Sequence, residues 1–382
     1  MTDTTSSAAD TAEADVRAYV ANRIGFLELN RPKALNALSR EMIRTMQQAL
    51  HAWRDDPHVV AVVVHSPHPR AFCAGGDVRF FHDAWQRGDR DAIDAFFIDE
   101  YTLNHTIFTY PKPYIALMHG VVMGGGMGIS QAARHTGGLR VVTDSTKMAM
   151  PETRIGLFPD VGMSWFLART PGAIGRYLAV TGATLDAAGA LYAQLADVYV
   201  PDAALPALLD TLRGARIDRG EQAVACVAEA AAAHKVVPTP DTSALADARA
   251  TIDRHFAHAD VDAILASLDA EQDCAAVDGW VEKAAHAMRS QLSPLSMAVS
   301  LEVVERARGA TMADCLRRDL DLTRSTFARG DVIEGVRALI VDKDHQPAWR
   351  FKTSADVGRA DVLAMFDSPW TPDAHPLRNL RD

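Results

Sequence analysis

The chain has 382 residues, of which 48% are hydrophobic and 23% charged, and its formal net charge is −10 at pH 7. This composition is typical of a globular protein long enough for two domains, and the acidic surplus argues against a nucleic-acid partner. No run approaches the roughly 18 consecutive apolar residues of a membrane span, so no membrane partner is expected.

Scattered cysteines and a polar N-terminal segment indicate the compartment. Cys73, Cys226, Cys274 and Cys315 form no C-x-x-C pair, which favours a reducing environment. Residues 1–15 carry no Lys or Arg and no apolar stretch, so they predict a disordered tail and neither a signal nor a transit peptide. We therefore expect a cytoplasmic protein.

The first half of the chain alternates predicted strands with predicted helices. Residues 16–30 alternate apolar and polar around Asn22-Arg23, which predicts a hairpin. After Ser39, apolar residues recur at helical spacing up to Trp53. Further strands are predicted at 59–66, 112–120, 139–144 and 147–150, a glycine turn at 71–77, a helical region from about 78 to 108, and a helix after the glycine-rich turn in 123–135. Such alternation indicates an α/β core.

Beyond residues 197–201 the pattern becomes helical. Amphipathic helices are predicted at 204–214, 243–257, 262–271 and 312–330, with a Pro/Thr break at 236–243. The predicted organisation is therefore a tail (1–15), an α/β catalytic core (16–201), a mainly helical C-terminal domain (202–370) and a second tail (371–382).

Two glycine-containing loops follow predicted strands, "FCAGGD" and "GVVMGGGMG". Glycine lets a backbone approach a ligand closely, and two amides aimed at one oxygen make an oxyanion hole. Gly76 and Gly125 are the candidates, and the alternative is tight turns that need glycine only for their geometry. A dinucleotide fingerprint is disfavoured because Ile129 stands where it requires glycine.

The loop "MPETRIGLFPD" places Glu152 and Asp160 in an apolar setting. Such surroundings raise a carboxyl pKa and suit the group to proton transfer or nucleophilic attack. The alternatives are solvated carboxylates or an ion pair with Arg154. No G-x-S-x-G elbow and no H-E-x-x-H motif is present, so neither a serine hydrolase nor a metal site is indicated.

Together, "NRPKALNAL", "AFCAGGD", "HGVVMGGGMG" and "MPETRIGLFPDVG" resemble the crotonase (enoyl-CoA hydratase/isomerase) superfamily, and specifically its 3-hydroxyisobutyryl-CoA hydrolase branch. "GDVIEGVRALIVDKDHQPAW" near the C-terminus is also similar to that branch. The resemblance implies a crotonase-like spiral of repeated ββα units with a helical C-terminal region that often mediates oligomers.

The resemblance also implies roles for individual residues. Gly76 and Gly125 would hold the thioester oxygen, Glu152 would be the main catalytic carboxylate, and Asp160 would assist it. The substrate would be bound by Glu100, and the CoA nucleotide by Arg31, Lys33 and Ala34. The hydratases carry their second glutamate where this chain has Gly128, and a glycine where it has Asp160. This displaced acid favours thioester hydrolysis over hydration.

We therefore expect hydrolysis of a short-chain 3-hydroxyacyl-CoA, namely 3-hydroxyisobutyryl-CoA to 3-hydroxyisobutyrate and CoA, a step of valine catabolism. No metal or redox cofactor is expected, since CoA arrives with the substrate, and the helical region would form a homo-oligomer. The alternatives are an enoyl-CoA hydratase/isomerase and a non-catalytic acyl-CoA-binding protein.

Overall fold

A computed structural model of the chain describes residues 14–234, 239, 243–272 and 279–382. Cys274, most of the 1–15 tail and most of the 236–243 break lie outside these residues. The described residues form two compact units, each assembled from three stretches of chain: unit 1 from Met1–Gly76, Thr106–Lys147 and Ala196–Val237, and unit 2 from Asp77–His105, Met148–Leu195 and Pro238–Asp382. The predicted domains are consecutive segments of the chain, whereas these units are not, and the predicted boundaries stay predictions.

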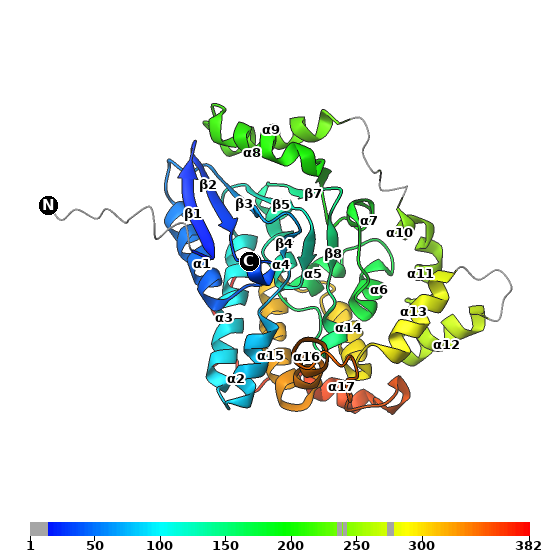
Figure 1. The fold of residues 1–382 in the computed structure, drawn as a ribbon. Helices are drawn as coiled ribbons and strands as arrows, with labels where there is room; N and C mark the ends of the chain where they lie inside the picture. Colours follow the sequence, from blue (N-terminus) through cyan, green and yellow to red (C-terminus); the bar gives the residue numbers. More distant parts are fainter. Residues whose placement is uncertain (1–13, 235–238, 240–242, 273–278) are drawn as a thin grey trace. The chain divides into compact units, whose positions relative to one another are not determined.

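Unit 1 is built on a six-stranded sheet with the order β1-β2-β3-β5-β7-β9. Only the β1–β2 pair is antiparallel, and the other pairs are parallel (Figure 1). The strands are β1 (Val16–Ala21), β2 (Ile24–Leu29), β3 (Ala61–His65), β5 (Tyr114–Met118), β7 (Arg140–Val142) and β9 (Val198–Tyr199). The predicted hairpin is confirmed, since Asn22 and Arg23 adopt φ angles of 50° and 63° in a two-residue turn between β1 and β2.

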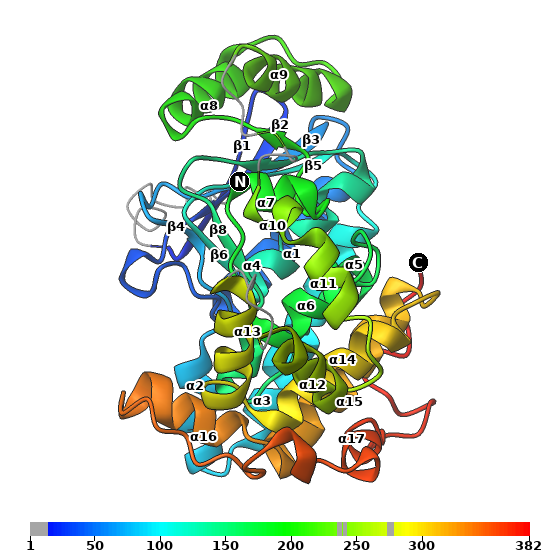
Figure 2. The ribbon, with the colours of Figure 1, turned by 90° about the vertical axis from the view of Figure 1, so that its right-hand side faces the viewer.

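Helices cover the sheet of unit 1. Figure 2 shows α8 (Leu205–Gly214) and α9 (Gly220–Ala232) lying across the strands. Their apolar faces complete a core with alternate strand residues: Ile24, Phe26, Ala61, Val63, Ile115, Leu117, Val141, Val200, Leu205, Leu208, Leu212, Ile217, Ala223 and Val227. The predicted helix after Ser39 is α1 (Arg40–Arg54), and the Ser39 hydroxyl caps it by accepting from the Met42 amide at 3.2 Å.

Around the two glycine loops the structure differs from the prediction, because a short strand precedes each loop. The predicted turn at 71–77 begins with a strand, β4 (Ala71–Cys73), which pairs in parallel with β6 (Val121–Met123). The predicted helix within 123–135 is one turn of α-helix, α4 (Gly125–Gly128), followed by a 3₁₀ segment over Gln131–Thr136. The sequence pattern did not predict β4 or β6, because these strands depend on pairing between distant segments and not on a local pattern.

Unit 2 is mainly helical. The helical region predicted from 78 to 108 is two helices, α2 (Val78–Gln86) and α3 (Arg90–Phe108), because Gly88 adopts a φ of +77° and ends the first. After β8 (Lys147–Ala149), the other helices are α5 (Met163–Leu167), α6 (Ile174–Thr181), α7 (Ala187–Tyr192), α10 (Ala244–Asp247), α11 (Arg249–His255), α12 (Val261–Gln272), α13 (Gly279–Ser290), α14 (Pro294–Arg306), α15 (Met312–Arg329), α16 (Val332–Val336) and α17 (Arg359–Met365).

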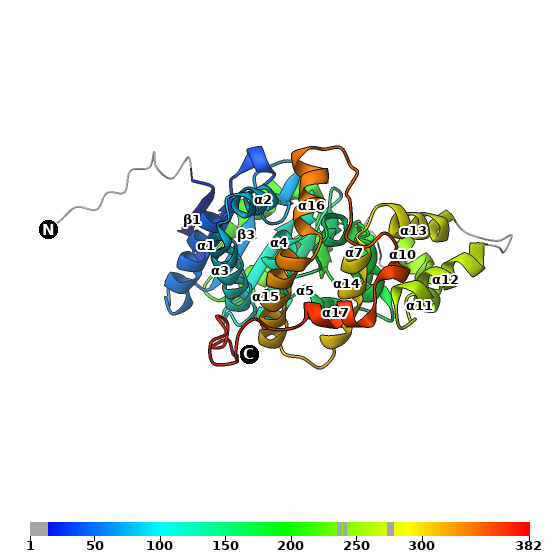
Figure 3. The same cartoon turned by 90° about the horizontal axis from the view of Figure 1, so that it is seen from below.

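Helix α15 occupies a central place in unit 2. It lies beside α3 (Figure 3), where Arg324 pairs with Asp94 and the rings of Phe97 and Phe327 lie 5.9 Å apart. Thr311 and Asp314 form a capping box at its N-terminus. No helix in the described ranges is both long and apolar enough to cross a membrane.

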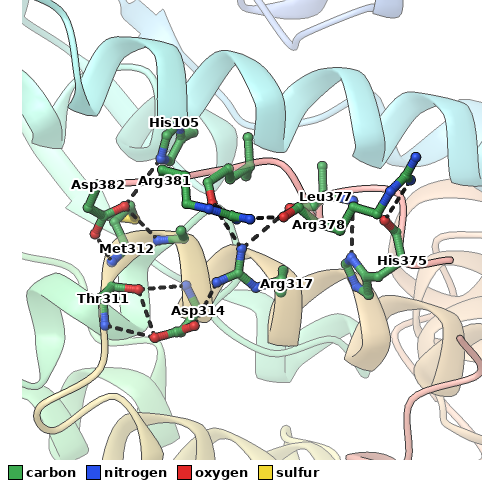
Figure 4. A network of polar contacts seen from close by, with 12 residues as sticks. His105, Thr311, Met312, Asp314, Arg317, His375, Leu377, Arg378, Arg381 and Asp382 are labelled. Carbon is green, nitrogen blue, oxygen red and sulfur yellow. Dashed lines mark hydrogen bonds and ion pairs between the residues drawn. The ribbon is translucent and has the colours of Figure 1, made fainter. Parts of the chain in front are cut away.

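The last residues of the chain pack on α15 (Figure 4). The Asp382 carboxylate accepts from the Ala313 amide at 3.0 Å and from the Met312 amide at 2.5 Å, and lies 3.2 Å from His105 Nε2 of α3. Arg317 donates to the Leu380 carbonyl at 3.2 Å. These contacts hold the N-terminal half of α15 in place.

Candidate active site

The two glycine loops of unit 1 lie side by side. Residues 74–76 follow β4, and residues 124–125 follow its parallel neighbour β6. Gly75 adopts a φ of +110°, and a Cβ atom on it would lie 3.3 Å from the Met123 carbonyl oxygen and 3.7 Å from the Gly125 amide nitrogen. Glycine allows both the dihedral angle and the close approach.

The backbone amides of Gly76 and Gly125 have no hydrogen-bond acceptor within residues 14–234, 239, 243–272 and 279–382. Gly125 begins α4, and amides in the first turn of a helix have no acceptor within the helix. The structure thus leaves two donors free on adjoining loops, as an oxyanion hole requires. Their role as that hole stays a prediction.

The segment predicted to bind CoA lies against the first glycine loop, also in unit 1. The Leu35 carbonyl accepts from the Ala74 amide at 3.1 Å, and the Leu38 amide donates to the Gly75 carbonyl at 2.7 Å. A buried Asn36 anchors the segment by donating to the Phe72 carbonyl at 2.9 Å.

The three residues named for CoA, Arg31, Lys33 and Ala34, flank or lie within a 3₁₀ turn over Pro32–Ala34. Lys33 is exposed, whereas the half-buried Arg31 donates to the Ala37 carbonyl at 2.8 Å. Lys33 therefore remains accessible for a phosphate, while Arg31 also braces its own loop.

In unit 2, Glu152 begins the 3₁₀ turn Glu152–Ile155 directly after Pro151. Its side chain is only 6% exposed, and its Oε2 atom has no hydrogen-bond partner in the part of the chain that the structure describes. Helix α14 supports the turn, because the Thr153 carbonyl accepts from the Ser293 amide at 3.0 Å. A buried carboxyl oxygen without a partner is costly, and the catalytic role of Glu152 stays a prediction.

Asp160 lies eight residues further along the same loop and is also buried. Its Oδ2 atom accepts a hydrogen bond from the hydroxyl of Tyr101, on α3, at 2.7 Å. The two residues after it, Val161 and Gly162, both adopt positive φ angles, of 52° and 75°. A left-handed backbone is unusual for a β-branched residue such as Val161, so this turn is strained.

Two further acids complete the cluster. Glu100, adjacent to Tyr101 on α3, is 2% exposed, and its Oε1 atom lacks a partner among the described residues. Asp319, on α15, is 0% exposed and accepts a hydrogen bond from the Gly162 amide at 2.8 Å. Unit 2 therefore gathers four buried carboxyl groups, from α3, the 152–160 loop and α15.

Burial governs the electrostatics of this cluster. It raises the pKa of Glu100, Glu152 and Asp319 well above their ordinary values, and the nearby Asp160 raises each of them further. Burial raises the pKa of Asp160 to about 6, against the opposing effect of the Tyr101 hydrogen bond. Burial in the cluster therefore favours the protonated form of all four carboxyl groups.

The apolar setting that the sequence predicts for Glu152 and Asp160 is what the structure shows. Arg154, considered as an ion-pair partner, instead donates to Gln291 at 2.7 Å. In the described ranges, no three His, Cys, Asp or Glu side chains are arranged to hold a metal ion.

Sequence reasoning missed Tyr101 and Asp319. Asp319 carried a signal, because it lies on the apolar face of α15 that includes Met312, Leu316 and Thr323. A carboxylate on such a face is buried when the helix packs, and only a partner or a function offsets the cost. Tyr101 gave no signal, since a tyrosine on a buried helix face is ordinary.

Comparisons with known proteins agree with the sequence resemblance. The family model for enoyl-CoA hydratase/isomerase matches residues 24–366. Similar proteins include "3-hydroxyisobutyryl-CoA hydrolase 1" of Arabidopsis thaliana, 36% identical over 90% of this chain and 89% of that protein. "3-hydroxyisobutyryl-CoA hydrolase, mitochondrial" of Xenopus tropicalis is 37% identical over 91% and 88%, respectively.

Two solved structures are similar over nearly their whole length. A carnitinyl-CoA dehydratase from Mycobacterium thermoresistibile has a TM-score of 0.82 at 37% identity, covering 93% of this chain and 97% of its own. An enoyl-CoA hydratase from Rhodobacter sphaeroides 2.4.1 has a TM-score of 0.83 at 34% identity, covering 95% and 99%. The predicted crotonase-like α/β fold with a helical C-terminal region is confirmed, and the chain belongs to the enoyl-CoA hydratase/isomerase family.

Proposed function

We propose that this chain hydrolyses a short-chain 3-hydroxyacyl-CoA thioester, with 3-hydroxyisobutyryl-CoA as its substrate. The observation that carries the proposal is similarity over about nine-tenths of the chain to proteins named 3-hydroxyisobutyryl-CoA hydrolase. The buried cluster of unit 2 adds chemical support, since it supplies carboxyl groups of unequal environment on one loop.

In the proposed reaction, the Gly76 and Gly125 amides donate to the thioester carbonyl oxygen and stabilise the negative charge that develops there. Glu152, in its ionised form, either takes a proton from water as the water attacks the carbonyl carbon, or attacks that carbon directly. In both routes the carbon–sulfur bond breaks and CoA leaves as a thiolate that is then protonated. In the second, water opens the resulting anhydride.

In the proposed reaction, Asp160 and Glu100 orient the reacting groups. Asp160 orients Glu152 or the water, and Glu100 accepts the hydrogen bond of the substrate's 3-hydroxyl group. Because Glu100 is buried and its Oε1 atom has no partner among the described residues, leaving that atom without a partner is costly, and a substrate with a 3-hydroxyl group that reaches it is favoured. The reaction needs no resident cofactor in this scheme, because CoA is part of the substrate.

A second candidate is hydration of an enoyl-CoA, favoured by the names of the two similar solved structures. Against it, the chain has Gly128 where the resemblance implies that hydratases carry a second glutamate, and this residue lies in the short helix α4. A hydratase needs two carboxylates acting on one water, so moving the second acid to position 160 changes its direction of attack.

The test compares the two reactions with the purified full-length chain. A thiol-reactive dye reports CoA released from 3-hydroxyisobutyryl-CoA, and loss of enoyl absorbance reports hydration of crotonyl-CoA. We expect CoA release and no hydration, and the opposite result would overturn the proposal. A non-catalytic binding protein would show neither reaction while retaining affinity for acyl-CoA.

A panel of acyl-CoAs with and without a 3-hydroxyl group tests the substrate class. We expect a preference for the hydroxylated members that Glu100→Ala abolishes. A role in valine degradation, a cytoplasmic location and a homo-oligomeric state belong to the same proposal. Several similar animal proteins carry "mitochondrial" in their names, so cell fractionation is the relevant measurement for location.

A further inference from the structure

The turn that follows Asp160 is held in an unfavourable backbone conformation. Val161 has a φ of +52° and Gly162 a φ of +75°. Backbone strain of this kind persists only where the surrounding structure enforces it, and it concentrates at functional sites. The groups that enforce the turn are therefore candidates for the machinery that positions Asp160.

Helix α15 supplies these groups. The Asp319 Oδ2 atom accepts the hydrogen bond of the Gly162 amide at 2.8 Å. Leu316 and Met312, one and two turns earlier on α15, pack closely against Gly162. A Cβ atom on Gly162 would lie 3.3 Å from the Leu316 side chain and 2.5 Å from that of Met312. The turn thus contacts α15 through one polar and two apolar side chains.

The proposed mechanism assigns no role to Asp319. It is completely buried, and its second oxygen, Oδ1, has no hydrogen-bond partner among the described residues. A carboxyl group so placed costs more than an apolar side chain of similar size, so stability alone does not account for it. Within the part of the chain that the structure describes, its one hydrogen bond is to the amide of the strained turn.

Within unit 2, α3 therefore fixes the side chain of Asp160 and α15 fixes the backbone that follows it. Tyr101, on α3, holds its carboxylate at 2.7 Å, and α15 holds the backbone that follows it. The α15 side is itself fixed, since its N-terminus is capped by Thr311 and Asp314 and bonded by Asp382 (Figure 4). A rigid second element that supports an active group is what precise positioning requires.

We propose that Asp319 is a positioning residue for the hydrolysis, which holds the Val161–Gly162 turn so that Asp160 meets Tyr101. The inference rests on the proposed function for its kinetic consequence, and it gives the helical C-terminal region a part in the active site. Asp319 itself does not touch the substrate.

The test uses two substitutions of the full-length protein. Asp319→Asn keeps an oxygen that accepts from the Gly162 amide, whereas Asp319→Leu keeps the approximate size and removes the acceptor. We expect Asp319→Leu to lower kcat by about 10–100-fold, the loss typical of small misplacements, with KM changed less than about threefold. Asp319→Asn should retain at least about a third of kcat.

The matched control is Asp321→Leu on the same helix. Asp321 accepts from Ser368 at 2.6 Å and lies outside the acid cluster. This variant should lose thermal stability and leave kcat unchanged. If Asp319→Leu behaves like the control, or if Asp319→Asn is as damaged as Asp319→Leu, the positioning role is wrong.

A crystal structure of Asp319→Leu separates this inference from the proposed function. We expect Val161 to relax to a negative φ and the Tyr101–Asp160 hydrogen bond to be lost. Retention of both features would overturn the inference whatever the enzyme's substrate. Absence of CoA release by the wild-type protein would instead refute the proposed function. If Asp319→Leu does not fold, the same measurements on Asp319→Ala decide.

Discussion

Replacing Tyr101 by Phe removes the hydroxyl that donates to Asp160 at 2.7 Å and changes little else, since both side chains are buried. A hydrogen bond to a charged acceptor contributes about 1.5–3 kcal/mol. One pKa unit corresponds to about 1.4 kcal/mol, so losing the bond should raise the Asp160 pKa by about one to two units. The starting pKa is about 6. The raised pKa of about 7–8 would leave Asp160 between about half and nine-tenths protonated at pH 7.

The expected consequence is a displaced pH profile. If ionised Asp160 orients the attacking group, kcat of Tyr101→Phe should fall about two- to tenfold at pH 7 and recover as the pH rises. CoA release measured across the pH range checks this. The control is Tyr110→Phe, which removes a buried hydroxyl bonded to the Leu50 carbonyl at 3.0 Å in unit 1. Coincident profiles for Tyr101→Phe and the wild type would refute the reasoning.

Three further substitutions follow from the same geometry. Glu152→Gln should raise Tm, and more at alkaline than at acidic pH. The pKa of Glu152 is raised in the folded state, so the wild-type fold loses stability as the pH rises through that pKa, whereas the glutamine does not ionise. An equal gain in Tm at both pH values would contradict this. Gly126→Ala places a Cβ atom 2.5 Å from the Cys73 carbonyl oxygen, so kcat should fall about 10–100-fold, whereas Gly214→Ala, with no atom within 4 Å, should leave kcat unchanged. Lys33→Ala should raise KM about two- to fivefold for CoA thioesters. Lys33→Ala should not change KM for pantetheine thioesters, and an equal rise for both would exclude a phosphate contact.

Local signals in the sequence were sufficient for much of unit 1. The Asn22-Arg23 turn and the Ser39 cap depend on residues adjacent in the chain, and the structure confirms both. The three-residue strands β4 and β6 depend instead on pairing between distant segments. No window of the sequence contains that information.

The candidate site divides in the same way. The apolar residues around Glu152 and Asp160 in the sequence predicted that both would be buried, and the structure confirms this. Tyr101 of α3, which donates to Asp160, lies 59 residues before it, and Asp319 of α15, which accepts from Gly162, lies 157 residues after that glycine. Such contacts follow from the tertiary fold, so motifs did not indicate Tyr101 or Asp319, although the position of Asp319 on the apolar face of α15 carried a signal.

The account depends on Glu152 as the group that drives thioester cleavage. The most direct measurement is the rate of CoA release from 3-hydroxyisobutyryl-CoA by the wild type and by Glu152→Gln, together with the affinity of each for the substrate. We predict a loss in kcat of about 10²–10⁴-fold with affinity retained. A variant that still releases CoA at a rate near that of the wild type would contradict the account.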